Sequence, residues 1–533
     1  MKCQKLFFWA SLSFFVLTSM PIVCLADEYR EIQASEILNQ IEKGEDVNLT
    51  NCRIIGELNL NEIKLENIPN PKYNESLKSG YYYSEGYLES HGVNIKIIKS
   101  NIVIRNSIFE NNLDFSNCLF TKSFSFAKVN CSSTANFRNT TFGNSAVFWE
   151  CTFGSFADFS FTTFGDSANF WNSIFGNYAS FRGCTFGDSA AFVFATFGDS
   201  ASFRGCTFGD SASFSGCTFD DSASFQHSIF GDSANFMKST FGNYASFRGC
   251  TFGDSAAFVF ATFGDYADFR YSTFGDSASF SYSAFDDSAS FEEVSFSNTS
   301  YFQWANFDDA VDFSGTLFNE VTLNGTEFKE MRVSWNSLEN SLVFDGPTYV
   351  KLIQNFRSLE QFEDADAAYY QYRKICQAEK SWIPFSKGGS KWNDVMMWFI
   401  CGYGVKPFRA FYLGGLIILL FSFIYRGSPT TSWRNGGETN SAQKSVIKTL
   451  LNLIPKIDWL NPGISRLSDN KDSAQKVTFW DSFYFSMVTF SMIGYGDWYP
   501  KDNFRKWVML EGLLGWITLG LFLVTLTNVM MRP

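Results

Sequence analysis

The stretch FGDSASFRGCTFGDSASF, residues 197–214, decides the fold of the first part of the chain, because its phenylalanines recur in alternating steps of five and six residues. Continued in both directions, this rule predicts core positions from Phe109 to Phe318, and all of them are Phe except Cys131. On an α-helix such steps would rotate the rings by roughly 140° and 240°, which scatters them around the axis. The fixed period instead indicates a solenoid of stacked coils.

Each core Phe follows a small residue two positions earlier, as in Ala201-Ser202-Phe203. Residues i and i+2 of a strand share a face, so both point inward while the residue between them points to water. This pattern resembles the pentapeptide-repeat family over about residues 98–328, with Phe in place of the usual central Leu. The resemblance implies a right-handed parallel β-helix with four sides per coil, and about ten coils. Residues 27–97 are expected to cap its open edge.

The composition excludes several function classes. The formal net charge of −12 argues against a nucleic-acid partner, and two histidines are too few for a histidine-based hydrolase or zinc enzyme. We therefore expect no enzyme activity, no cofactor and no bound metal apart from a permeant ion. The 12 cysteines include no CxxC pair, and four occupy the inward small-residue position, where we expect packing thiols rather than disulfides. These four are Cys184, Cys206, Cys217 and Cys250.

Residues 1–26, MKCQKLFFWASLSFFVLTSMPIVCLA, have the character of a secretory signal. Lys2 and Lys5 precede an apolar run, Pro21 ends it, and small residues lead to a cleavage position after Ala26. The alternative is an uncleaved membrane anchor. The signal peptide predicts that the β-helix lies on the extracellular side.

The composition changes after the repeats, and the remaining segments suit a membrane domain. Residues 408–425 and 507–531 are apolar and long enough to span a bilayer. The segment between them is too short to cross twice, which favours a re-entrant pore helix and loop. The other expected segments are a helical linker at 329–390, an interfacial helix at 391–407, an inter-span loop at 426–479, and the pore helix with its loop at 480–500.

This half of the chain resembles the two-span potassium-channel pore family over about residues 408–531. The resemblance implies that Gly494 and Gly496 let peptide carbonyls face an axis, where four chains replace the water around a potassium ion. It also implies a homotetramer in a lipid bilayer. Met492 stands where the family has threonine, which removes one hydroxyl ligand and leaves the ion selectivity open. The matching residues are Ser491, Met492, Ile493, Gly494, Tyr495, Gly496 and Asp497.

Two residues of the second span are further candidates. Gly515 lies near the position of the family's gating hinge. Glu511 is a carboxylate inside a span, where such groups usually face protein or water. It either lines the pore or forms a structural bond behind the filter, and the second role is favoured.

The expected orientation follows from the signal. With the β-helix outside, the first span runs inward and the pore loop enters from the cytoplasmic side. This is inverted relative to ordinary potassium channels and similar to ionotropic glutamate receptors. Basic residues near the span ends favour the same orientation weakly.

The sequence thus predicts a potassium-type channel subunit, multi-pass in the cell membrane, with a β-helix whose ligand is unknown. The alternative is a membrane-anchored surface recognition protein whose channel-like tail does not conduct. Two columns of acidic residues on the β-helix either gather cations or serve as solvated turn residues, and the second role is favoured. Their members are Asp188, Asp210, Asp232, Asp254 and Asp276 in one column, and Asp199, Asp221, Asn243, Asp265 and Asp287 in the other.

Overall fold

The computed structural model describes residues 29–70, 94–382, 390–426, 428–429, 457–458, 464–466, 477–494, 498–501 and 504–530. The predicted signal at residues 1–26 and most of the inter-span loop at 426–479 lie outside the described residues. The chain divides into two compact units, Met1–Val343 and Phe344–Pro533.

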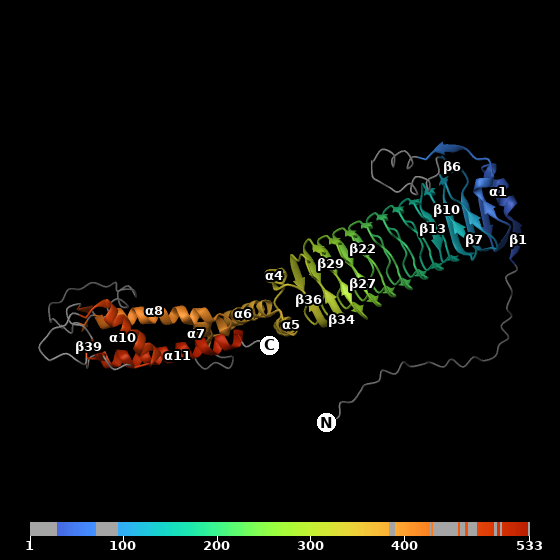
Figure 1. The fold of residues 1–533 in the computed structure, drawn as a ribbon. Helices are drawn as coiled ribbons and strands as arrows, with labels where there is room; N and C mark the ends of the chain where they lie inside the picture. Colours follow the sequence, from blue (N-terminus) through green and yellow to red (C-terminus); the bar gives the residue numbers. More distant parts are fainter. Residues whose placement is uncertain are drawn as a thin grey trace, which may run out of the picture. The chain divides into compact units, whose positions relative to one another are not determined.

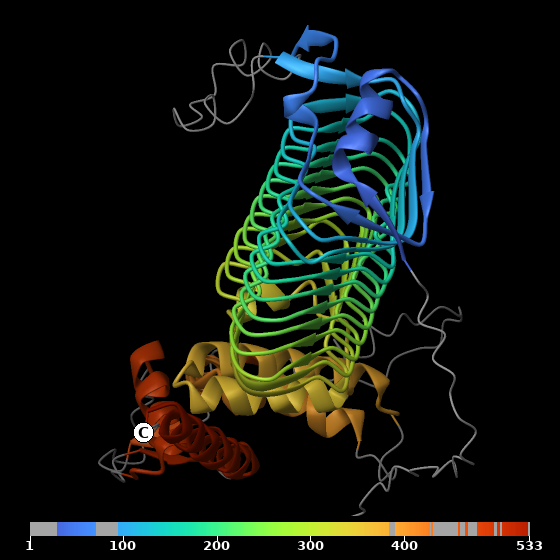
Figure 2. The ribbon, with the colours of Figure 1, turned by 90° about the vertical axis from the view of Figure 1, so that its right-hand side faces the viewer.

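The first unit is a β-solenoid of about 13 turns (Figures 1 and 2), which confirms the predicted β-helix. Successive coils pair in parallel with an offset of 22 residues, so that β15 (Thr163–Phe164) lies beside β17 (Thr185–Phe186) with Thr opposite Thr and Phe opposite Phe. Because this register repeats from about residue 102 to about residue 317, identical side chains stack in columns; the last coil pairs at an offset of 21 residues, as Phe307 does with Phe328.

The phenylalanine columns form the core. The rings of Phe181, Phe203 and Phe225 are fully buried and stack with centroid distances of 4.8 and 4.9 Å. Rings from neighbouring sides meet edge to face, as Phe192 and Phe203 do at 5.4 Å and 90°. Both arrangements suit the charge distribution of aromatic rings, and each buried ring stabilises the fold by about 1.5–3 kcal/mol.

The small inward position also supplies hydrogen-bond donors. The Sγ atom of Cys206 donates to the carbonyl of Phe181 at 2.9 Å, and the Ser228 hydroxyl donates to the carbonyl of Phe203 at 2.6 Å. All four cysteines predicted to be packing thiols are free and buried. Burial raises the pKa of the Cys250 thiol to about 12. These thiols therefore act as small, weakly polar packing groups.

The solenoid begins earlier than residue 98. Strand β2 (Val47–Thr50) pairs in parallel with β7 (Ile102–Phe109), and β1 (Arg30–Gln33) pairs with β3 (Cys52–Ile55). Buried aliphatic side chains, such as Ile54, fill the inward positions here in place of Phe. Helix α1 (Ala34–Glu42) lies at this end of the solenoid (Figures 1 and 2) and buries one apolar face.

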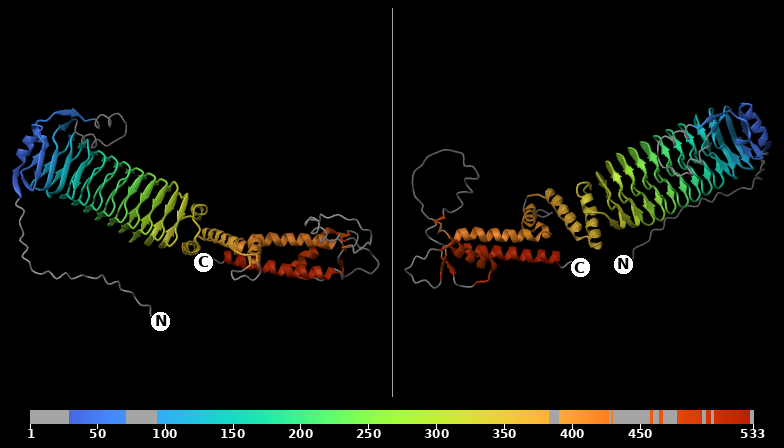
Figure 3. Two further views of the ribbon diagram at one scale, coloured as in Figure 1. Left: turned by 180° about the vertical axis from the view of Figure 1, so that it is seen from behind. Right: turned by 45° about the horizontal axis from the view of Figure 1, so that its top comes forward.

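The second unit is helical. Helices α5 (Gly346–Ser358) and α6 (Phe362–Glu379) pack together as a pair, and α7 (Lys391–Cys401) follows. Helices α8 (Pro407–Arg426) and α11 (Arg505–Met530) lie side by side, and the shorter α10 (Phe479–Ser491) packs against both (Figure 3). Both α8 and α11 are long and apolar enough to cross a membrane, with mean hydropathies of 1.8 and 1.9.

Candidate functional site

Helix α10 begins at a reciprocal cap. The Thr478 side chain accepts the backbone N–H of Asp481, and the Asp481 carboxylate accepts the backbone N–H of Thr478 at 2.8 Å. Such a capping box satisfies donors that the first helical turn leaves free. Further along, Phe485 and Phe490 pack into an apolar cluster with Tyr425 of α8. The cap fixes where α10 starts, and the cluster fixes which side of it faces α8.

Helix α10 ends where the predicted filter begins. Met492 has a left-handed backbone with φ of 57°, and Gly494 follows with φ of 58°, so the chain turns sharply out of the helix. The Ser491 hydroxyl donates back to the carbonyl of Met487 at 2.7 Å. Within one chain, Met492 and Ile493 are each 59% exposed.

The remaining predicted filter residues, Tyr495, Gly496 and Asp497, lie outside the described residues. Beyond them, β40 (Trp498–Pro500) pairs in antiparallel fashion with β39 (Ile464–Arg466). The described elements α10 and β40 therefore flank the predicted filter along the chain.

Glu511 joins the three helices of this domain at one point. Its carboxylate is fully buried and accepts the hydroxyl of Tyr425, from α8, at 2.6 Å. The hydroxyl of Ser486, from α10, donates to the other carboxylate oxygen. Neither partner could be singled out from sequence, because Ser and Tyr are common in such helices and lie far from Glu511 along the chain.

Gly515 lies where two backbones touch. A Cβ atom at this position would lie 2.2 Å from the carbonyl oxygen of Phe490 and 2.9 Å from its carbonyl carbon. Helix α11 runs without interruption from Arg505 to Met530. Close packing of α10 on α11 therefore explains the glycine, and a hinge at this position stays a prediction.

Comparison with known families supports both halves of this description. A family model described as ion channel matches residues 456–532, which include α10, the segment after it and α11. A second model, described as pentapeptide repeats (9 copies), matches residues 181–229, 192–239, 203–251 and 280–327. The chain joins pentapeptide repeats to an ion-channel domain. The channel match and the two long apolar helices α8 and α11 indicate a membrane protein. No curated protein matches the chain.

The acidic columns of the repeats have a structural role within the solenoid. The Asp188 carboxylate accepts the backbone N–H of Asp210 at 2.9 Å, and the Asp210 carboxylate accepts that of Asp232 at 3.1 Å. These side chains thus bond the next coil, whereas Asp287, at the end of the other column, accepts the backbone N–H of Ser288 in its own turn at 2.7 Å. Among the described residues, no cluster of His, Cys, Asp or Glu is suited to a metal ion.

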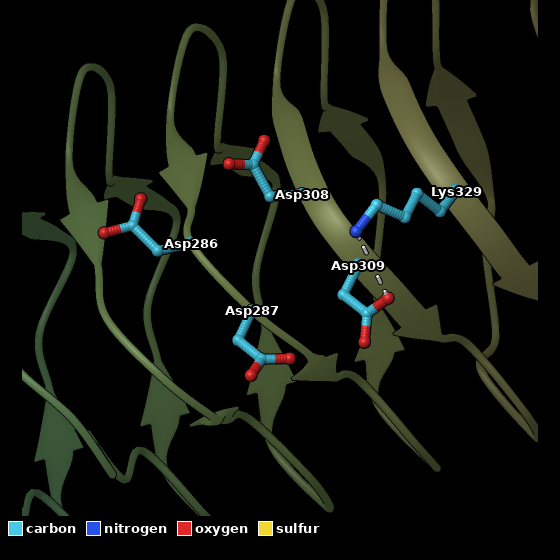
Figure 4. A pocket seen from close by; sticks show the side chains of 5 residues that line it. All are labelled: Asp286, Asp287, Asp308, Asp309 and Lys329. Atoms are coloured by element: carbon cyan, nitrogen blue, oxygen red, sulfur yellow. Dashed lines mark ion pairs between the residues drawn. The ribbon is translucent and has the colours of Figure 1, made fainter.

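An open acidic groove of about 460 Å³ lies near the carboxyl-terminal end of the repeats (Figure 4). Lys329 forms an ion pair with Asp309 at 3.7 Å, and Asn306 donates to Asp308 at 2.6 Å. The lining residues are Asp286, Asp287, Asp308, Asp309 and Lys329. The groove thus continues the acidic turn columns. Part of its negative charge is paired with Lys329 or accepts a hydrogen bond from Asn306.

Proposed function

We propose that the chain is one subunit of a homotetrameric, potassium-type cation channel. The observation that carries this proposal is the end of α10, where left-handed residues Met492 and Gly494 turn the chain directly into Tyr495-Gly496-Asp497 within the matched channel domain. Such a turn lets peptide carbonyls face a common axis. Four chains are needed because each loop supplies a quarter of the carbonyl ring.

Conduction is passive in this proposal, with potassium as the permeant ion at the filter carbonyls and no cofactor. Met492 lacks the hydroxyl that the threonine of the family would supply. We therefore expect potassium to permeate, with weaker discrimination against sodium than in channels that have the hydroxyl.

Glu511 acts in this proposal behind the filter and not on the pore axis. Its two hydrogen bonds, to Tyr425 and Ser486, tie the pore helix to both spans. A side chain that lined the pore would not need both of its oxygens bonded inside one subunit.

The β-helix is proposed to lie outside the cell, with the pore loop entering from the cytoplasmic side. Protease added to intact cells should then cleave a site inserted near residue 250, and protease added to the outside of sealed inverted vesicles, which expose the cytoplasmic face, should not. Cleavage only from the cytoplasmic side would reverse the orientation and leave conduction untouched.

The conduction test uses purified full-length protein in potassium-loaded liposomes. The wild type and Gly520→Ala, which alters an exposed helical position with no atom within 4 Å of the new Cβ, should release potassium. Gly494→Asp should not, because any Cβ adds strain at this left-handed backbone and the added carboxylate changes the charge beside the proposed carbonyl ring. Native mass spectrometry should give a tetramer for all three. An intact wild-type assembly without flux would favour the alternative, an anchored surface protein with a non-conducting tail.

A further inference from the structure

Helix α7 places apolar side chains outward and a charged one inward. Trp392, Met396 and Phe399 follow the spacing i, i+4 and i+7, so they lie on one stripe, and they are 57%, 53% and 57% exposed. Asp394, in the first turn of the same helix, is only 7% exposed. An exposed apolar stripe of this kind marks contact with a partner or a membrane.

The buried carboxylate fixes the direction in which this stripe points. Asp394 pairs with two cations of the α6 segment, Arg373 at 3.0 Å and Lys380 at 2.5 Å. The Trp398 indole N–H donates to the hydroxyl of Tyr370, also in α6, at 2.7 Å. Since these contacts hold the inner face of α7 against α6, the opposite face with the stripe stays exposed.

Two positive charges stand beside α7 at the start of the first span. Lys406 places its Nζ atom 4.2 Å from the centre of the Tyr370 ring, and the guanidinium of Arg409 lies 5.5 Å from the Trp398 ring and donates to the Trp398 carbonyl. Neither cation forms an ion pair within the part of the chain that the structure describes. The aromatic rings position these charges without neutralising them.

We propose that the apolar stripe of α7 lies in the headgroup region of the bilayer, and that Lys406 and Arg409 bind the phosphate of an anionic phospholipid. Helix α7 ends at Cys401 and the candidate span α8 begins at Pro407, so the stripe is close to the membrane surface along the chain. Trp and Phe on one face with cations beside them are typical of interfacial helices. The short chain between α7 and α8, together with the two cations beside the stripe, favours an anionic lipid over a second protein copy as the occupant. This inference rests on the membrane location of α8 and is independent of conduction.

Bound lipid is the first test. Full-length protein is reconstituted with equal amounts of phosphatidylcholine and phosphatidylglycerol, extracted in mild detergent, and examined by native mass spectrometry for retained lipid. The wild type should retain phosphatidylglycerol preferentially. One basic side chain near an anionic surface raises the affinity about fivefold. Lys406→Gln should therefore reduce the preference for phosphatidylglycerol over phosphatidylcholine about fivefold, and the double variant with Arg409→Gln about 30-fold.

The single variant Lys406→Gln is the cleaner of the two, because Arg409 also donates a hydrogen bond that supports the fold. The matched control is Lys374→Gln, at an exposed position of α6, which should keep the wild-type preference. Equal retention of both lipids by the wild type, or an equal loss in the control, would overturn the proposal. Competition by inorganic phosphate would also overturn it, because the site would then recognise a free anion and not a lipid.

The position of the stripe is tested separately with a nitroxide label on Met396→Cys in proteoliposomes. Molecular oxygen concentrates in lipid and a nickel chelate stays in water. The spin relaxation of the label at residue 396 should therefore be accelerated more by oxygen than by the nickel chelate. A label on Lys374→Cys should show the reverse. A label at residue 396 that responds mainly to nickel, or that is shielded from both reagents by a protein contact, would refute the membrane location of the stripe. Neither readout requires an open pore.

Discussion

Replacing Gly515 by alanine tests the close contact between α10 and α11, and Gly520 supplies a matched control. Both glycines lie in the same helix, so alanine gains about 1 kcal/mol of helix propensity at either position. At Gly520 the new Cβ meets no atom within 4 Å, whereas at Gly515 it would lie 2.2 Å from the carbonyl oxygen of Phe490. Subtracting the stability change of Gly520→Ala from that of Gly515→Ala removes the gain in helix propensity and leaves the cost of the contact.

That cost can be estimated from the distance. Ordinary contacts of Cβ atoms begin at 3.4 Å. The two backbones must therefore separate by about 1 Å, and overpacking of this kind costs about 1–3 kcal/mol. Gly515→Ala should thus be less stable than Gly520→Ala by about this amount, and it should displace the end of α10 just before Met492. Potassium release from liposomes should fall in Gly515→Ala and not in Gly520→Ala.

The measurement is thermal unfolding of the purified assembly at one scan rate, together with flux. A gating hinge at Gly515 predicts a different result, because alanine would then stiffen the helix, raise stability as at Gly520 and change only the flux. Equal melting temperatures and equal flux for the two variants would refute both the contact and its link to the filter.

Four further results are expected. Glu511→Gln keeps one oxygen acceptor, and its amide N–H can donate to the other hydroxyl. Glu511→Ala leaves the Tyr425 hydroxyl without its acceptor, at about 1–3 kcal/mol, while the Ser486 hydroxyl can still donate to the Ile418 carbonyl, so the alanine variant should melt earlier than the glutamine variant. Because burial raises the pKa of the Cys206 thiol well above its ordinary value, the reactive thiolate is absent at neutral and mildly alkaline pH, and iodoacetamide should label Cys206 only after denaturation. Asp210→Asn should leave the melting temperature unchanged, both with and without calcium, since Asn243 already serves as the same acceptor in the neighbouring column. Phe203→Ala, which removes a fully buried ring, should cost about 3–5 kcal/mol.

The solenoid could be predicted from sequence because each coil repeats one local rule. A Phe on each of four sides fixes the inward positions, and the constant 22-residue offset then fixes the register, as the pairing of Thr163 with Thr185 shows. The amino-terminal coils could not be found this way. There, Ile and Leu replace Phe, and Val47 pairs with Ile102 across an intervening segment that breaks the period.

The channel domain was predictable to a different extent. A carboxylate and a glycine are conspicuous in an apolar span, so Glu511 and Gly515 could be singled out before their surroundings were known. Their partners could not, because Tyr425 is 86 residues from Glu511, and Ser486 is 25 residues from it. Contacts of this kind depend on how three helices pack, and hydrophobic periodicity does not specify that packing.

The two contacts between α10 and α11 share one register. Glu511 and Gly515 are one turn apart on α11, and the residues they meet on α10, Ser486 and Phe490, are one turn apart as well. One turn of each helix is therefore held by a hydrogen bond at one end and by backbone contact at the other, immediately before the left-handed turn at Met492. The contributions of neighbouring groups in one packed unit to the free energy of unfolding are not additive. Once alanine at residue 515 has separated the helices, the bond of Glu511 to α10 is already strained, so the double variant Glu511→Ala/Gly515→Ala should lose less stability than the sum of the two single losses. Strict additivity would mean that the two contacts are independent and that α10 is not held as a unit.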